Sequence, residues 1–205
     1  MSNPEQYFHT QFERLRRETL DGQTHYRIWR SLNNAFASNP RLVEISPFFF
    51  RMTVEAHMDS VLLSLTKLTD KTRGALSIHD FLRYVEKHSG MFPYASDSEI
   101  HESTKRDFRR LDELQIHLER LREHRNNDFI HISKEVLSRP DFDIYSEFPV
   151  TYEEIDLLLQ TIGKILNRYC QFMTKSIYLM EEWDEKSQMA DLFWYLEQAI
   201  KTSGK

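Results

Sequence analysis

The sequence predicts an all-α protein, a bundle of about five or six helices. Apolar residues recur at steps of three and four over long stretches, which is the spacing of one face of a helix. Only 5 Gly and 6 Pro interrupt the 205 residues, too few for a β-protein with many tight turns. Hydrophobic residues form 40% of the chain and aromatic residues 13%, which is enough for a sizeable core.

Two long helices are expected in the first part of the chain. Residues 4–38 have helical periodicity with a break expected at 21–24, and 38–42 are interpreted as the connection that follows. Ser46 is then the expected N-cap and Pro47 the first residue of the second helix. The apolar surface of that helix is broad enough for the most buried helix of a bundle. Its apolar residues are Phe49, Met52, Val54, Ala56, Val61, Leu62, Leu65 and Leu68.

A short helix and a long helix follow. Ser77 is expected to cap the short helix, which runs to about His88. The long helix is expected over about 99–134, where leucines alternate steps of three and four and therefore share one face. These leucines, which we expect in the core, are Leu111, Leu114, Leu118 and Leu121.

The C-terminal part of the sequence predicts two more helices. Thr151 and Glu154 have the spacing of a capping box, and the helix that they open is expected to reach about Trp183. We predict that the bundle forms one domain over 1–185 and that 186–205 add an amphipathic helix packed on the same domain. The apolar face of that last helix is formed by Met189, Leu192, Phe193, Leu196 and Ile200.

Charge and cysteine content restrict the possible functions. The net charge of -5 gives no global case for binding nucleic acid, so any such contact must use a local basic patch. Cys170 is the single cysteine, which excludes an intramolecular disulfide and a zinc site built from several cysteines. The N-terminus lacks the apolar run of a signal peptide, and no apolar stretch approaches the roughly 20 residues of a membrane span. We therefore expect a cytoplasmic protein with no membrane contact.

Histidine spacing could suggest a metal site. His117, His124 and His131 follow one another at intervals of seven along the predicted long helix. Two turns of helix separate neighbours by roughly 10 Å, which is too far for two of them to bind one ion. We expect no metal and no other cofactor, and we interpret these histidines as a solvated or interface stripe.

The stretch "REHRNNDFIHIS" (122–133) interrupts the leucine pattern with polar residues. The stepping of the leucines continues to Arg125 and Asp128, where an apolar residue would be expected. Because an unpaired buried charge is very costly, Arg125 must lie at an interface or in a polar cleft. A structural pair between Arg125 and Asp128 is one explanation. On a regular helix His131 lies about 9 Å from Arg125 along the axis, so one helix does not bring them side by side, although the long Arg side chain or a kink narrows the gap. A two-fold axis along this helix would let each copy contribute an Arg and a His to one shared groove.

"RNNDFIH" (125–131) resembles the signature of the HEPN domains, the higher eukaryotes and prokaryotes nucleotide-binding superfamily. That signature is an Arg, four to six residues and a His, often with a polar residue after the Arg, and Asn126 matches this preference. "PFFFRMTVEAHMDSVLLSLTKLTD" (47–70) followed by "SIHDFLRYVEKH" (77–88) is similar to the abortive-infection branch of the superfamily, the AbiU-type HEPN-like proteins. The resemblance covers roughly residues 20–185.

The resemblance implies an all-α homodimer that acts as a metal-independent endoribonuclease. His131 would take a proton from a ribose 2′-hydroxyl or protonate the leaving 5′-oxygen. Arg125 would stabilise the charge on the phosphorane, and cleavage would leave a 2′,3′-cyclic phosphate. The residues expected to bind RNA or support the site are Asn126, Asn127, Asp128 and Arg122.

The resemblance also implies a context and partners. It indicates a phage-defence or toxin–antitoxin system, with RNA as the ligand, a second copy in the dimer and an antitoxin as a possible partner. Local positive charge would come from Arg120, Arg122 and Lys134, which nearby carboxylates oppose, so RNA binding should depend strongly on salt. The alternative is a non-catalytic dimerisation or interaction protein in which Arg125, Asp128 and His131 are structural.

Overall fold

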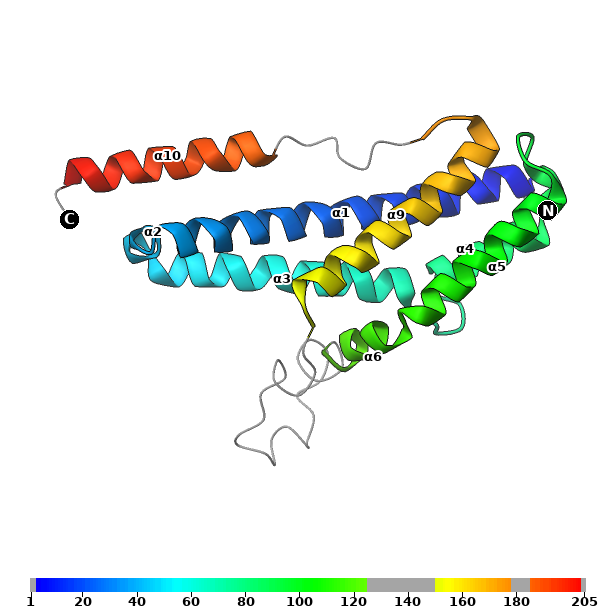
Figure 1. Ribbon diagram of the computed structural model, residues 1–205, viewed down its shortest axis with the longest axis horizontal. Coiled ribbons are helices and arrows are strands. Elements are labelled where there is room, and N and C mark those ends of the chain that lie inside the picture. Colours follow the sequence, from blue (N-terminus) through cyan, green and yellow to red (C-terminus); the bar gives the residue numbers. More distant parts are fainter. Residues whose placement is uncertain (1–2, 125–149, 178–184, 204–205) are drawn as a thin grey trace, which may run out of the picture. The chain divides into compact units, whose positions relative to one another are not determined.

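The computed structural model describes residues 3–124, 150–177 and 185–203 (Figure 1). Within these ranges the chain forms eight α-helices and one short 3₁₀ helix and contains no strand. The all-α fold class predicted from the sequence is therefore confirmed. The number of helices exceeds the expected five or six, because a short helix follows the first long one and the long helix after residue 97 has a break.

The chain divides into two compact units. The first contains Met1–Leu20 and Leu62–Met180, and the second contains Asp21–Val61 and Glu181–Lys205. Two long helices, α1 (Pro4–Ser38) and α3 (Pro47–Thr69), contribute residues to both units. The single domain expected over 1–185, with its added C-terminal helix, stays a prediction.

The first unit contains most of the large buried side chains. Besides the ends of α1 and α3 it is built from α4 (Ile78–Lys87), the 3₁₀ helix η1 (Ser89–Met91), α5 (Asp97–Glu113), α6 (Gln115–His124) and α9 (Tyr152–Thr174). The ring of Phe8 on α1 lies 5.5 Å from that of Phe81 on α4 and 5.3 Å from that of Phe92. The side chains that are less than 2% exposed include Phe8, Phe12, Leu65, Leu68, Phe81, Leu82, Ile100, Leu111, Leu118 and Tyr169.

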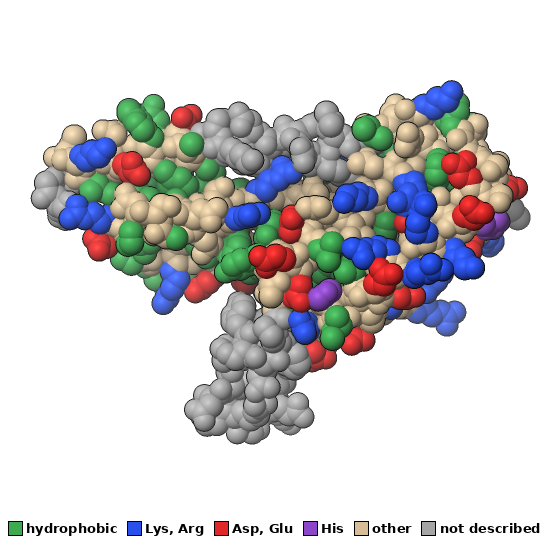
Figure 2. Space-filling model, in the orientation of Figure 1, with side chains coloured by type: hydrophobic (Ala, Val, Ile, Leu, Met, Phe, Trp, Pro, Cys, Tyr) green, Lys and Arg blue, Asp and Glu red, His purple; other side chains and the backbone are tan. Residues whose placement is uncertain are grey.

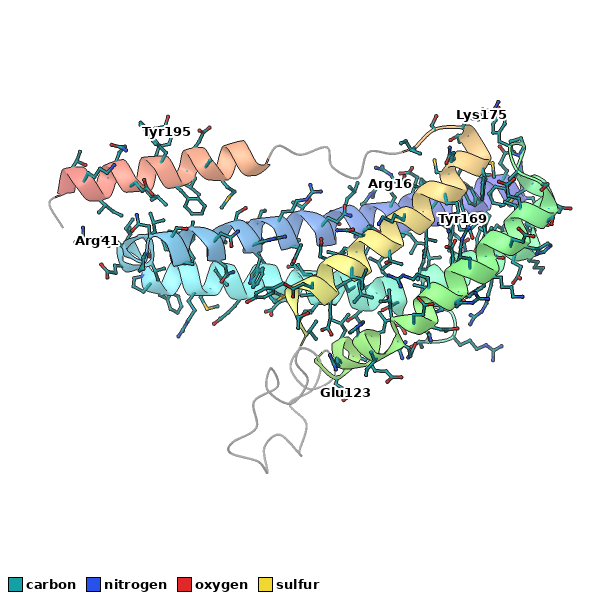
Figure 3. The ribbon with its side chains drawn as sticks, in the orientation of Figure 1. Arg16, Arg41, Glu123, Tyr169, Lys175 and Tyr195 are labelled. Atoms are coloured by element: carbon teal, nitrogen blue, oxygen red, sulfur yellow. The ribbon has the colours of Figure 1, made fainter. Side chains whose placement is uncertain are left out.

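A buried carboxylate joins α5 to α9. Asp107 is 3% exposed, and its Oδ1 accepts a hydrogen bond from Nη1 of Arg168. The hydroxyl of Tyr169 donates to Oδ2 of the same carboxylate at 2.8 Å. Burial raises the pKa of the Tyr169 phenol, and the Asp107 charge raises it further, so the hydroxyl keeps the proton that it donates. Figure 3 shows Tyr169 between α9 and α5.

The leucine stripe is confirmed, although its helix is interrupted. At Leu114 the backbone leaves the helical conformation (φ -92°, ψ 4°) between α5 and α6. Its N–H donates to the carbonyl of Leu111 at 3.2 Å, a tighter turn than an α-helix makes. The break does not rotate the stripe out of the core, because Leu111, Leu114, Leu118 and Leu121 are each at most 3% exposed. The predicted continuation to 134 lies outside the described residues.

The capping predictions are confirmed. The Ser77 hydroxyl accepts from the N–H of Asp80, and Thr151 with Glu154 forms both hydrogen bonds of a capping box. The prediction that the helix after Thr151 reaches about Trp183 is wrong, because α9 ends at Thr174. Lys175 takes the left-handed conformation (φ 59°) and its N–H donates to the carbonyl of Gln171 at 2.9 Å, which terminates the helix.

Two further expectations are corrected in α1 and α3. The expected break at 21–24 is absent, because the one glycine there is tolerated within a helix held by buried residues on both sides. α3 is not the most buried helix along its whole length. Most side chains of its last two turns are buried, whereas Phe48 is 70% and Phe49 59% exposed in the first turn. In this first turn, α3 has apolar side chains around more of its surface than the neighbouring described elements cover.

The second unit combines the later part of α1, α2 (Arg41–Ile45), the first part of α3 and α10 (Glu185–Ser203). Phe36 contacts the Phe50 ring at 5.2 Å and the Phe193 ring at 6.5 Å, so α10 packs on this unit. The predicted apolar face of α10 is only partly covered, since Leu192 remains 45% exposed. Nδ1 of His25 lies 2.8 Å from Nδ1 of His57. Partial burial and then His25 lower the pKa of His57.

Candidate functional site

The structure describes the helices on both sides of the predicted site. Arg125, Asn126, Asn127, Asp128 and His131 all lie outside the described residues, and Arg122 lies within them. α6 ends at His124, directly before the motif, and α9 begins at 152 after it. Figure 3 shows Glu123 at this end of α6. The described residues therefore include the two helix ends that flank the motif in the sequence, the end of α6 and the start of α9. We call these two ends and their contacts the frame.

Arg122 fastens α6 to the end of α3. Its Nη2 donates to the carbonyl oxygen of Thr69 at 3.3 Å, and Thr69 is the last residue of α3. A helix leaves its last four carbonyls without partners inside the helix, and a cation there also compensates the negative end of the helix dipole. Arg122 thus has a structural contact three residues before Arg125. Its predicted role in supporting an RNA site stays a prediction.

Glu154 joins α6 to the first turn of α9. Its Oε1 lies 2.9 Å from Nη1 of Arg120 and 2.7 Å from Nδ1 of His117. The His117 contact lacks hydrogen-bond direction, so we describe it as a close contact rather than a hydrogen bond. The other oxygen, Oε2, accepts from the N–H of Thr151 at 2.8 Å. One carboxylate, with a side chain only 14% exposed, therefore holds the helix before the motif and the helix after it.

The contacts of Glu154 change the interpretation of two sequence features. The sequence identifies the capping role of Glu154 but not its partners across the fold, because Arg120 lies 34 residues away. His117, which we interpreted as part of a solvated or interface stripe, has a side chain 22% exposed against this carboxylate. Arg120, expected to supply positive charge to RNA, is engaged by the same oxygen.

Replacing Glu154 tests this frame. Glu154→Gln keeps the shape of the side chain but removes the charge that faces Arg120 and His117 and weakens the capping box. We expect the free energy of unfolding to fall by about 1 kcal/mol in urea denaturation at neutral pH. Glu153→Gln is the matched control, since Glu153 is an exposed neighbour in the same first turn. Equal losses in both variants would show that only the helix dipole is affected.

A buried histidine lies close to the Arg122 end of the frame. His79, in the first turn of α4, is 5% exposed, and neither ring nitrogen has a hydrogen-bond partner among the described residues. Burial lowers its pKa to about 4, with further lowering by Lys71, Arg83 and Arg122 and an opposing effect of Asp112. His79 is therefore neutral at physiological pH. The sequence pattern does not single out His79 by itself. Its place two residues after the Ser77 cap, in the first turn of a helix, was the available signal.

No group of three or more His, Cys, Asp or Glu side chains within the described ranges could hold a metal ion. No described helix combines the length and the apolar character that crossing a membrane requires.

The family comparison covers nearly the whole chain. The HEPN family model described as AbiU2 matches residues 5–190. The chain belongs to the AbiU2 family. It is thus a HEPN-type abortive-infection protein. No curated protein and no solved structure matches this AbiU2 chain. The match spans α1 to α9 and includes the "RNNDFIH" segment at 125–131.

Proposed function

We propose that this AbiU2 protein is a metal-independent endoribonuclease in which Arg125 and His131 act in a groove shared by two copies. The observation that carries the proposal is the Arg-Asn-x4-His motif inside the family match, directly after a helix with a buried leucine stripe. A step of four from the buried Leu121 falls on Arg125. A charged residue in the register of a buried stripe needs an interface or a polar cleft.

The proposed reaction needs only side chains and RNA. The 2′-oxygen attacks the adjacent phosphorus and loses its proton, the bond from phosphorus to the 5′-oxygen breaks, and that oxygen gains a proton. In a symmetric groove one His131 can accept the first proton and the other His131 can donate the second, because the ordinary pKa of histidine lies near neutrality. Arg125 donates forked hydrogen bonds to the phosphorane oxygens, and Asn126 orients an adjacent oxygen.

The frame supports this assignment. Catalytic groups need positions that are held within a fraction of an ångström, which is easier on rigid elements than on free loops. Glu154 fixes the end of α6 against the start of α9, and Arg122 fixes α6 against the end of α3. The α6 partners in these contacts, Arg120 and Arg122, lie five and three residues before Arg125 in the sequence. The proposal extends to RNA as substrate, a second copy as partner, a cytoplasmic location and a phage-defence or toxin–antitoxin role, with an antitoxin as a possible further partner.

RNA cleavage in chelator tests the proposal. Wild-type protein is expected to cleave structured or single-stranded RNA and leave 2′,3′-cyclic phosphate ends, identified by mass spectrometry. Arg125→Ala and His131→Ala should each lower the rate by at least about 100-fold, since each removes a group that acts in the transition state. Arg73→Ala and His101→Ala are matched controls, because both side chains are exposed and lie outside the motif.

Two results would contradict the nuclease. Cleavage that survives in both motif variants would remove the assignment of Arg125 and His131. Absence of cleavage in the wild type, with all variants folded and dimeric by light scattering, would favour the interaction protein in which Arg125, Asp128 and His131 only organise the dimer.

A further inference from the structure

Two stretches, one on α5 and one that ends just after α9, concentrate positive charge in a chain of net charge -5, although each helix as a whole carries more carboxylates than cations. Residues 105–110 on α5 contain four cationic side chains and one carboxylate, and residues 157–177 contain three cations and no carboxylate. Figure 2 shows many Lys and Arg side chains over α5 and the second half of α9, with Asp and Glu side chains among them. We define the basic face by Lys105, Arg106, Arg109, Lys164, Arg168 and Lys175.

The network described for Asp107 explains why this charge is not neutralised. The Arg168 contact places the two cation-rich stretches side by side within the first unit. Asp107 is the only carboxylate within either stretch, and it is 3% exposed with both oxygens engaged. The positive charge of Arg106 also acts on the Tyr169 phenol, and its Nη2 donates to the Ser103 hydroxyl at 3.3 Å. The remaining positive charge faces solvent.

The exposed cations of the face are available for a ligand. Lys105, Arg109 and Lys164 are exposed and form no ion pair among the described residues. Three carboxylates border the face on α5. Glu113 is 2.9 Å from Arg110, which lies outside the defined face, and Glu102 and Asp112 are exposed. The balance on the face therefore stays positive.

An exposed aromatic ring lies at one end of the face. Tyr94 is 48% exposed, and Nζ of Lys175 lies 4.5 Å from the centre of its ring. The N–H of Tyr94 donates to the carbonyl of Phe172 at 3.1 Å, which fixes the ring against the end of α9. Figure 3 shows Lys175 at that end. Proteins that bind single-stranded nucleic acids combine cations, which contact the phosphates, with exposed aromatic rings, on which bases stack.

We infer that the basic face binds the phosphate backbone of single-stranded RNA, with a base stacked on Tyr94. The inference rests on the proposed function for the choice of RNA among polyanions. The face does not include the motif. Arg109 on the face and His124, the residue directly before the motif, are 15 residues apart, which is at most about 23 Å along the helices. A strand held by the face can thus extend toward the motif, and the face determines affinity for RNA that is long enough to reach both.

Binding is measured without cleavage, in a His131→Ala parent protein with chelator. The probe is a fluorescent oligouridylate of about 16 nucleotides, the upper range of a single-strand site, and the readout is anisotropy at several salt concentrations. The face variant adds the charge reversals Lys105→Glu, Arg109→Glu and Lys164→Glu, which leave the Asp107 network intact. We expect binding to weaken at least about tenfold and the salt slope to fall by about 2, since three phosphate contacts each contribute about 0.7.

The control variant carries the same change in net charge on other elements of the first unit. It adds Arg14→Glu, Arg73→Glu and Lys87→Glu to the same parent, all at exposed residues. Because distant surface charges are screened by salt, its affinity should stay within about threefold of the parent at physiological ionic strength. A Tyr94→Ala variant should also weaken binding while leaving the salt slope unchanged, because stacking releases no counterions.

Several results would overturn the inference. One is an equal loss of RNA affinity in the face variant and the control variant. The others are an unchanged RNA affinity in the face variant and an absence of RNA binding by the parent. Loss of binding to anionic phosphatidylserine vesicles in the face variant, with RNA binding unaffected, would assign the face to a membrane surface instead. Cleavage by the wild type is scored separately. Binding through the face without cleavage would end the nuclease proposal alone, and cleavage with unchanged binding by the face variant would end this inference alone.

Discussion

Replacing Asp107 by Ala is expected to lower the free energy of unfolding by about 3 kcal/mol or more. The substitution removes the carboxylate but leaves the Arg168 guanidinium and the Tyr169 hydroxyl beside a buried site with no partner. The loss of one member of such a network is more damaging than the loss of all of it, because the buried Tyr169 hydroxyl stays unpaired and Arg168, whose side chain is 28% exposed, loses its charged partner. Asp107 also holds α5 against α9, so the loss should appear as global unfolding rather than as local fraying.

Urea denaturation followed by circular dichroism measures this effect. Glu102→Ala is the matched control, because Glu102 is an exposed carboxylate one turn away on α5, and it should change stability by less than about 0.5 kcal/mol. Combining Asp107→Leu with Arg168→Met and Tyr169→Phe should recover much of the loss, because no polar group is then left unpaired. A triple variant as unstable as the sum of its single changes would contradict the network.

Local sequence signals predicted the elements, whereas distant partners could not be predicted. The spacing of Leu111 and Leu118 and the capping pattern at Thr151 need only neighbouring residues, and the structure confirms them. Asp107 and Arg168 are 61 residues apart, so no periodicity could reveal their contact. The end of α9 was missed for another reason. Lys175 adopts a left-handed cap without the glycine or asparagine that normally marks one.

The same distinction applies to the site. The polar motif at 125–131 is visible in sequence because it breaks a leucine stripe, but the function of the cations around it depends on their partners. Arg120 and Arg122, the expected sources of charge for RNA, are engaged by Glu154 and by the carbonyl of Thr69. The exposed cations without an ion pair among the described residues include Lys105 and Arg109 on α5 and Lys164 on α9. Composition shows that a basic patch must be local, whereas its location depends on which carboxylates are already buried in the fold.

Acidification from pH 7 to pH 4 is expected to lower the free energy of unfolding by about 3 kcal/mol through His79 alone. In the unfolded chain this imidazole has the ordinary pKa of 6.5, and in the fold burial lowers its pKa to about 4. Between these values the unfolded state binds more protons, so stability rises with pH across this window and is lost as the pH falls. Lys71, Arg83 and Arg122 disfavour the proton further, and Asp112 on α5 offsets only part of their effect.

The contribution of His79 is obtained by comparing variants that cannot titrate. His79→Phe and His79→Leu, two apolar replacements of different shape, should each flatten the stability curve between pH 4 and pH 7 by about 3 kcal/mol relative to wild type. His101→Phe is the control, because His101 is exposed on α5 and the wild-type pH dependence should persist. The remaining dependence comes from other groups, including His57, whose pKa is also lowered. A folded His79 variant with an unchanged slope would show that His79 binds protons equally in both states. A buried imidazole that has three cations beside it and no hydrogen-bond partner in the described part of the chain should not do so.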